Sequence, residues 1–233
     1  MKKLKVMILT LCAAVVMVGC NNLGKGTAIG AGGGAILGAI VGKIAGNTAV
    51  GAAIGTAVGA GTGALIGKHM DKVKAQAEAV QNAQVESVTD ANGLQAVKLT
   101  FGEQGIKFNT GSSVLSTSAQ TSLQQLANLL KTNTDCDVAI QGYTDNAGWK
   151  NSTAEQSAQK NLNLSQQRAQ AVTNYLQSLG VGSNQIRSTT GYGEANPVAD
   201  NSTAAGKAQN RRVEVYMYAS QAMINAAEAG TLQ

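Results

Sequence analysis

Asp145 and Arg168 are two charged residues whose positions suggest a binding site. Asp145 follows "DVAIQGY" (residues 137–143), which alternates like a strand, and Arg168 lies in "LSQQRAQAVTNYLQSLG" (residues 164–180), whose apolar residues repeat like those of a helix. In a strand-loop-helix unit, the loop and the start of the helix lie at the same edge of the sheet. Both side chains are therefore expected to face a common cleft.

Arg168 shares the inward-facing stripe of its predicted helix with Leu164 and Ala171. A guanidinium there is costly unless an anion meets it, and a helix that begins near Asn161 would place the cation at the wrong end of the helix dipole. Asp145 and Arg168 together match a zwitterion, because the carboxylate can take an ammonium and the guanidinium can grip a carboxylate with two hydrogen bonds. Two alternatives stay open: the two side chains pair with each other, or Arg168 donates to backbone carbonyls.

Catalysis, a metal ion and a cofactor are not expected. The only histidine, His69, precedes the predicted domain, and the pattern around Cys136 indicates a small buried residue, so a zinc cluster and a Cys/His pair are both missing. Asp145, Glu155 and Glu194 could furnish carboxylates, but the sequence brings no pair of them together.

The elements that would position the cleft follow one another between residues 93 and 218. Helical patterns cover residues 118–131 and 164–180. Strand patterns cover residues 94–101, 105–108, 137–143, 185–193 and 211–218. This alternation predicts an α/β (α+β) sandwich with helices packed on a mixed sheet. Residues 219–233 are expected to add a C-terminal helix and tail.

The N-terminus, "MKKLKVMILTLCAAVVMVGC", follows the plan of a secretory signal, with lysines, an apolar run and then small residues. Its end resembles the lipobox of bacterial lipoproteins. The resemblance implies a signal peptide over residues 1–19, cleavage before Cys20 and a diacylglycerol on the Cys20 sulfur. Residues 20–25 would form the lipidated N-terminus, and Asn21 implies sorting to the outer membrane. The alternative is an ordinary secretion signal in which Cys20 is incidental.

Removal of this signal changes the charge and cysteine content. Three lysines of the signal contribute to the formal net charge of +5, so the remaining charge does not call for a nucleic-acid partner. Cys12 leaves with the signal and Cys20 would be acylated. No intramolecular disulfide is therefore expected in the mature chain, because Cys136 remains alone.

Residues 26–68 carry a glycine at every fourth position, with one slip of phase near Gly46. Spacing of four places the glycines on one helical face, where another backbone can approach closely. We expect two antiparallel helices of about twenty residues each, a length near that of a membrane span. The pattern resembles the glycine zippers of bacterial envelope lipoproteins. It fits a hairpin in the outer membrane, an oligomerising zipper or a flexible spacer. Residues 69–92 are expected to form a polar helical linker.

Three motifs lie in order along the rest of the chain: "GYTDNAG", "NLNLSQQRAQAVTNYL" and "GYGEANPVADNSTAAGKAQNRRVEV". Together they resemble the peptidoglycan-associated OmpA-like domain over residues 93–218. The resemblance implies binding to the diaminopimelate of the peptidoglycan stem peptide, whose free end is a zwitterion. It implies that Asp145 takes the ammonium and that Arg168 holds the carboxylate.

The same resemblance implies further site residues. Thr144 and Asn146 flank the aspartate in its motif, and Asn161 and Leu164 match the N-x-x-L-S segment at the rim. Arg212 belongs to the N-R-R-V run, where either an arginine near the cleft or a residue that stabilises the fold is expected.

The sequence departs from the family over "WKNSTAEQSAQK" (residues 149–160), where the family has only a few residues. A capping box from Ser152 to Glu155 would give this insertion an extra helical turn. The insertion could shield the ligand, contact the glycan or form a solvated loop.

These observations predict an outer-membrane lipoprotein that faces the periplasm and tethers the membrane to peptidoglycan. Its partners would be the stem peptide and the membrane that holds its lipid anchor. The alternative is a membrane-embedded oligomer or pore assembled by the glycine zipper, with the OmpA-like domain as an anchor.

Overall fold

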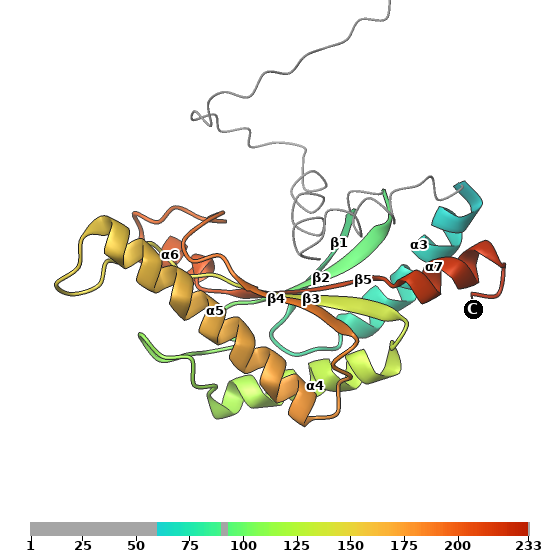
Figure 1. Ribbon diagram of the computed structural model, residues 1–233, viewed down its shortest axis with the longest axis horizontal. Coiled ribbons are helices and arrows are strands. Elements are labelled where there is room, and N and C mark those ends of the chain that lie inside the picture. The colour runs from blue at the N-terminus through green and yellow to red at the C-terminus, as the bar shows by residue number, and fades with distance from the viewer. Residues whose placement is uncertain (1–59, 90–92, 233) are drawn as a thin grey trace, which may run out of the picture. The chain divides into compact units, whose positions relative to one another are not determined.

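The computed structural model describes residues 60–89 and 93–232 of the 233-residue chain (Figure 1). The predicted signal peptide, Cys20 and residues 26–59 of the glycine-rich segment lie outside the described residues. The described elements are α3 (Ala60–Ala77), β1 (Gln84–Thr89), β2 (Gln95–Phe101), α4 (Thr117–Thr132), β3 (Cys136–Gly142), α5 (Ala154–Ser178), β4 (Ile186–Gly191), α6 (Ala204–Asn210), β5 (Val213–Ala219) and α7 (Gln221–Glu228).

The strands form one five-stranded sheet in the order β1-β2-β5-β3-β4. β3 and β4 run parallel, whereas the β1–β2, β2–β5 and β3–β5 pairs are antiparallel. The α/β prediction with helices on a mixed sheet is confirmed.

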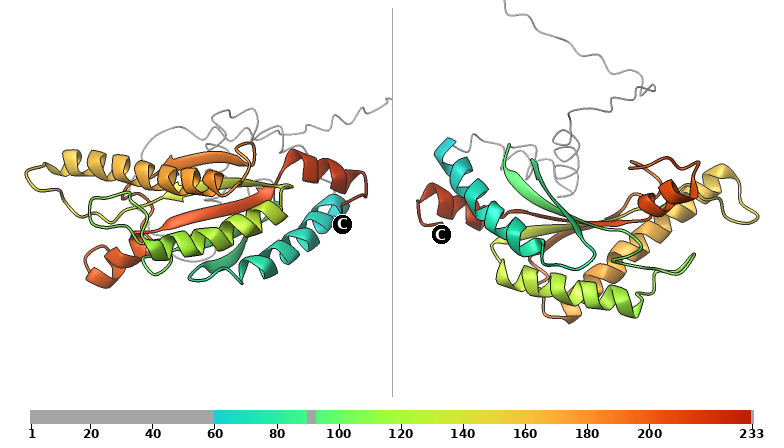
Figure 2. Two further views of the ribbon diagram at one scale, coloured as in Figure 1. Left: turned by 90° about the horizontal axis from the view of Figure 1, so that it is seen from below. Right: turned by 180° about the vertical axis from the view of Figure 1, so that it is seen from behind.

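Alternation along the strands directs one set of side chains toward the helices. Leu99 of β2, Ile140 of β3 and Val215 of β5 are fully buried and belong to the same core cluster as residues of α3, α4, α5 and α7. Figure 2 shows α5, α4 and α3 side by side across this face of the sheet. The opposite face carries a smaller buried cluster of Ala96, Ala139, Tyr216 and Tyr218.

The segment before β2 corrects the expectation of a polar helical linker over residues 69–92. Residues 84–89 form β1, which pairs with β2, and α3 packs into the core. The buried residues of α3 are Ile66, Met70, Val73 and Ala77. Their spacing of three and four residues makes a narrow apolar stripe, which the surrounding alanines and charged residues obscure in the sequence.

The core also extends beyond the predicted domain limits of 93 and 218. α3 and β1 precede residue 93, and α7 contributes Met223, Ile224 and Ala227 to the main core cluster. The apparent boundary at residue 93 follows a change in composition and does not coincide with the edge of the packed core.

One local prediction fails, and one short helix was missed. Residues 105–108, expected as a strand, follow a turn in which the amides of Gly105 and Ile106 both donate to the Gly102 carbonyl at 3.0 Å. Phe108 then makes only an isolated bridge with Leu115. α6, which begins at a Thr203 cap, was not predicted, because its seven residues lack an apolar period.

α5 is longer than predicted and begins inside the insertion. Its capping box joins Thr153 and Gln156, one residue after the expected Ser152–Glu155 pair. The helix spans 25 residues, so Arg168 lies in its interior and not near the positive end of the dipole. Gly180, with φ of +90°, follows the end of the helix as predicted.

In the described part of the chain, no helix is long and apolar enough to cross a membrane. Cys136 is fully buried at the start of β3, as predicted, and burial raises the pKa of its thiol. The thiol is therefore a packing group and not a nucleophile.

Candidate functional site

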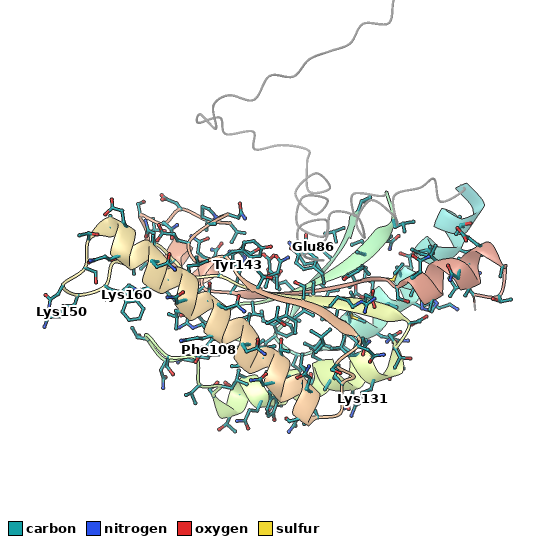
Figure 3. The ribbon with its side chains drawn as sticks, viewed as in Figure 1. Glu86, Phe108, Lys131, Tyr143, Lys150 and Lys160 are labelled. Atoms are coloured by element: carbon teal, nitrogen blue, oxygen red, sulfur yellow. The ribbon has the colours of Figure 1, made fainter. Side chains whose placement is uncertain are left out.

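A cleft of about 570 Å³ lies beyond the C-terminal end of β3. Its walls are formed by the loop after β2, the loop after β3, residues 161–168 of α5 and the region around α6. The lining residues are Glu103, Phe108, Thr110, Gly111, Thr144, Asp145, Ala147, Gly148, Trp149, Lys150, Asn161, Leu164, Arg168, Lys207 and Arg211. Figure 3 shows Phe108 and Tyr143 near the inner end of this region, and Lys150 and Lys160 at the outer end of α5.

Five of the seven predicted peptidoglycan-binding residues meet in this cleft: Thr144, Asp145, Asn161, Leu164 and Arg168. Asn146 is exposed and does not line the cleft. Arg212 does not line the cleft either, but together with Arg168 and Arg211 it lines a neighbouring cavity of about 20 Å³.

Close packing of α5 on the sheet positions Arg168. A side chain at Gly142 of β3 would meet the backbone of Ser165, and one at Gly191 of β4 would meet the backbone of Gln166. Only glycine permits this approach, which brings the middle of α5 over the ends of both parallel strands. Arg168 follows directly on the same helix and points into the cleft that these strand ends border.

Arg168 is 6% exposed and donates to two backbone carbonyls. Its Nε–Ser112 O distance is 3.0 Å, its Nη2–Asn109 O distance is 3.3 Å, and its guanidinium carbon lies 5.0 Å from the centre of the Phe108 ring. Burial, followed by the nearby Arg211, lowers the pKa of Arg168. Among the described residues, no carboxylate forms an ion pair with this guanidinium and Nη1 has no hydrogen bond. The site therefore contains a buried cation that an anionic ligand would neutralise.

Asp145 is 7% exposed and has an arginine partner, but that partner is not Arg168. Asp145 Oδ1 accepts from the Ala147 amide at 3.0 Å, and Oδ2 pairs with Arg211. Arg211 also donates to Glu103 at 2.6 Å, and this hydrogen bond is the main reason why its pKa is raised. A ligand ammonium at Asp145 would therefore share the carboxylate with Arg211 or replace it.

Arg211 and Glu103 are cleft residues that were absent from the predicted site. The N-R-R-V run pointed to an arginine near the cleft, but the sequence does not show which of its two neighbouring arginines faces the cleft. Glu103 lies 42 residues before Asp145 in the chain, and no sequence signal connects the two.

Arg212 is buried in a separate polar network. Its guanidinium lies 3.8 Å from the centre of the Tyr143 ring and donates to Glu214 at 2.6 Å and to the Asn196 carbonyl at 3.1 Å. Glu214 also accepts from the Tyr216 hydroxyl at 2.6 Å. These contacts favour the alternative that Arg212 stabilises the fold.

Glu214→Ala is expected to lower the free energy of unfolding by about 3–5 kcal/mol, because the change leaves the Arg212 charge buried and unpaired. Urea denaturation of the variant would measure this loss. The control is Glu78→Ala, which breaks an ion pair with Lys74 in which Lys74 is 33% and Glu78 is 54% exposed, and which should cost less than about 1 kcal/mol. Equal losses in the two variants would contradict a special role for the Arg212–Glu214 pair.

Asn161 uses its amide to hold other parts of the cleft. Its Oδ1 accepts from Trp149 Nε1 at 2.8 Å, and its Nδ2 donates to the Ala147 carbonyl at 3.1 Å and to Glu194 at 3.3 Å. Thr144 differs, because its Oγ1 is buried with no hydrogen-bond partner among the described residues. Thr144 Oγ1 is thus an unsatisfied polar atom within the wall of the cleft.

Cations outnumber carboxylates in the lining. Lys150, Arg168, Lys207 and Arg211 face two acids, Glu103 and Asp145, and Arg211 pairs with both of those acids. The arrangement suits a ligand that carries carboxylates and offers an ammonium at one point. In residues 60–89 and 93–232, no group of histidine, cysteine or acidic side chains is placed to hold a metal ion.

Two family models match this chain. Residues 107–211 match the OmpA family, and residues 1–71 match the YMGG-like Gly-zipper. The match to the OmpA family contains the cleft residues from Phe108 to Arg211. The resemblance of the three motifs to an OmpA-like domain and that of the glycine-rich segment to a glycine zipper are both confirmed.

Two named relatives match part of this chain. The probable lipoprotein YiaD of Escherichia coli (strain K12) is 35% identical over 150 residues, which are 64% of this chain and 63% of that protein. The peptidoglycan-binding protein ArfA of Mycobacterium tuberculosis (strain ATCC 25618 / H37Rv) is 44% identical over 93 residues, 40% of this chain and 26% of ArfA. The chain thus spans less than two thirds of the length of these relatives.

A solved structure supports the same fold. The cell wall anchor of the T6SS from Pseudomonas aeruginosa superimposes with a TM-score of 0.51 at 26% sequence identity, and the match covers 65% of this chain and 97% of that one.

Proposed function

We propose that this chain, whose residues 107–211 form an OmpA-family domain, is an outer-membrane lipoprotein that binds peptidoglycan noncovalently and tethers the membrane to the cell wall. The observation that carries the proposal is the buried Arg168 guanidinium, which has no carboxylate partner among the described residues and shares a cleft with Asp145. The diaminopimelate of a stem peptide supplies both the carboxylate and the ammonium that this cleft suits.

The relatives support the cell-wall part of the proposal. ArfA is named for peptidoglycan binding, the Pseudomonas aeruginosa structure is a cell wall anchor, and YiaD is named a probable lipoprotein. Cys20 would carry the lipid, and the domain would face the periplasm. Many anchored copies facing one polymer would convert a weak contact with each stem into a firm attachment.

The test is co-sedimentation of the chain from residue 21 onward with two purified peptidoglycans. One contains diaminopimelate, and the other contains lysine in its place and so lacks the terminal carboxylate. We expect the chain to sediment with the first and to stay in the supernatant with the second. Equal sedimentation with both would show that the zwitterion is not recognised, and no sedimentation with either would contradict the tether.

A further inference from the structure

Trp149 is held in the wall of the cleft by hydrogen bonds of its indole N–H and of its backbone amide. The indole N–H donates to Asn161 Oδ1 at 2.8 Å. At the six-membered ring, Cη2 would lie 3.5 Å from a Cβ at Gly111, whose φ of +66° also favours glycine. The backbone amide of Trp149 donates to Ser157 Oγ at 3.0 Å. Lys160, which does not line the cleft, lies over one face of the ring with its Nζ 5.8 Å from the ring centre, which leaves the other face for a ligand in the cleft.

Trp149 lies nearer the mouth of the cleft than the charged residues that would hold the zwitterion. Asp145 and Arg168 are 7% and 6% exposed, whereas Trp149 is half-buried and the next residue, Lys150, is exposed. Figure 3 places Lys150 and Lys160 at the outer end of α5, beyond Phe108 and Tyr143. A ligand that is held at Asp145 and extends toward Lys150 would therefore lie along the indole.

The cleft has more room than a diaminopimelate end requires. Its volume of about 570 Å³ falls within the range of about 300–1,000 Å³ that encloses ligands much larger than one amino acid. The stem peptide is joined covalently to the glycan strand. The part of the ligand that extends toward the mouth is therefore the peptide and then the sugars.

This inference rests on the proposed function: we infer that Trp149 is a second subsite, which takes a saccharide ring of the glycan strand against its indole face. Pyranose rings present apolar C–H faces that pack on aromatic rings, and their hydroxyl groups can reach Lys150 at the same rim. A rigid indole loses little conformational entropy when it makes such a contact.

The test uses the chain from residue 21 onward and two soluble probes. One is the tripeptide alanyl-γ-glutamyl-diaminopimelate, and the other is the same tripeptide on N-acetylglucosaminyl-N-acetylmuramic acid. We expect about tenfold tighter binding of the disaccharide-tripeptide by wild type, and loss of this preference in Trp149→Ala. Trp149 is the only tryptophan, so its fluorescence should change when the disaccharide probe binds and respond much less to the tripeptide.

Trp149→Phe distinguishes stacking on a sugar ring from positioning of the loop through Asn161. Phenylalanine keeps an aromatic face but lacks the N–H that donates to Asn161. Retention of most of the preference in Trp149→Phe supports the subsite. If Trp149→Phe and Trp149→Ala weaken both probes equally, Trp149 acts through Asn161 on the loop and the inference is overturned. Equal affinity of wild type for both probes also overturns it and leaves the proposed function intact, whereas no binding of either probe overturns both.

Discussion

Arg168→Ala is expected to weaken binding to diaminopimelate-type peptidoglycan about 100-fold, since truncating one partner of a buried charge pair costs about 2–5 kcal/mol. The guanidinium is buried against Phe108 and held by two carbonyls, and its Nη1 has no hydrogen bond among the described residues. This preorganised donor would meet the ligand carboxylate, and alanine would leave that carboxylate without a partner. The apparent dissociation constant from co-sedimentation would measure the change.

Two further variants control for charge and for folding. Arg168→Lys keeps a cation but lacks the planar pair of donors, so we expect it to recover only part of the binding. Arg187→Ala removes an arginine that lies on β4 and does not line the cleft, so it should bind as wild type does. Near-normal binding by a folded Arg168→Ala variant would contradict the zwitterion site. Arg168 would then serve only to hold the loop through its hydrogen bonds to the two backbone carbonyls.

A fragment that begins at residue 91 is expected not to fold stably, although residue 91 lies close to the start of the predicted domain. The cut removes β1 and α3, whose Ile66, Met70 and Val73 are at most 1% exposed. Burial of each such side chain contributes about 1.5–3 kcal/mol, so their combined loss approaches the about 5–15 kcal/mol that stabilises a typical protein. Circular dichroism during thermal denaturation would show a missing or noncooperative transition.

The matched control is the fragment that begins at residue 60, which retains α3 and should unfold cooperatively. Met70→Ala in that longer fragment tests the contact itself, and we expect a loss of about 2–5 kcal/mol because Met70 is fully buried. A cooperative transition of the shorter fragment at the temperature of the longer one would show that α3 does not stabilise the domain.

The sequence by itself was sufficient to predict the helices and strands whose apolar residues repeat with a strong period. β2, β3, β5, α4 and the C-terminal part of α5 lie where alternation or helical spacing placed them. Asp145 and Arg168 were correctly expected to share a cleft, although Arg168 lies in the interior of α5 and reaches the strand ends through the close packing of the helix on Gly142 and Gly191. The period of the apolar residues indicates whether a segment is a helix or a strand and which of its faces is buried.

The tertiary structure decided which groups meet in the cleft. Arg211 pairs with both Asp145 and Glu103 across long separations in the chain, and Trp149 enters the wall because the insertion extends α5 at its start. The tertiary structure also decided the role of α3. Its short apolar stripe is a weak signal in the sequence, and only the fold shows that this stripe packs into the core. Pairing of charges and burial of a helix face depend on which distant segments the fold brings together. The spacing of residues within one segment carries no information about those long-range contacts.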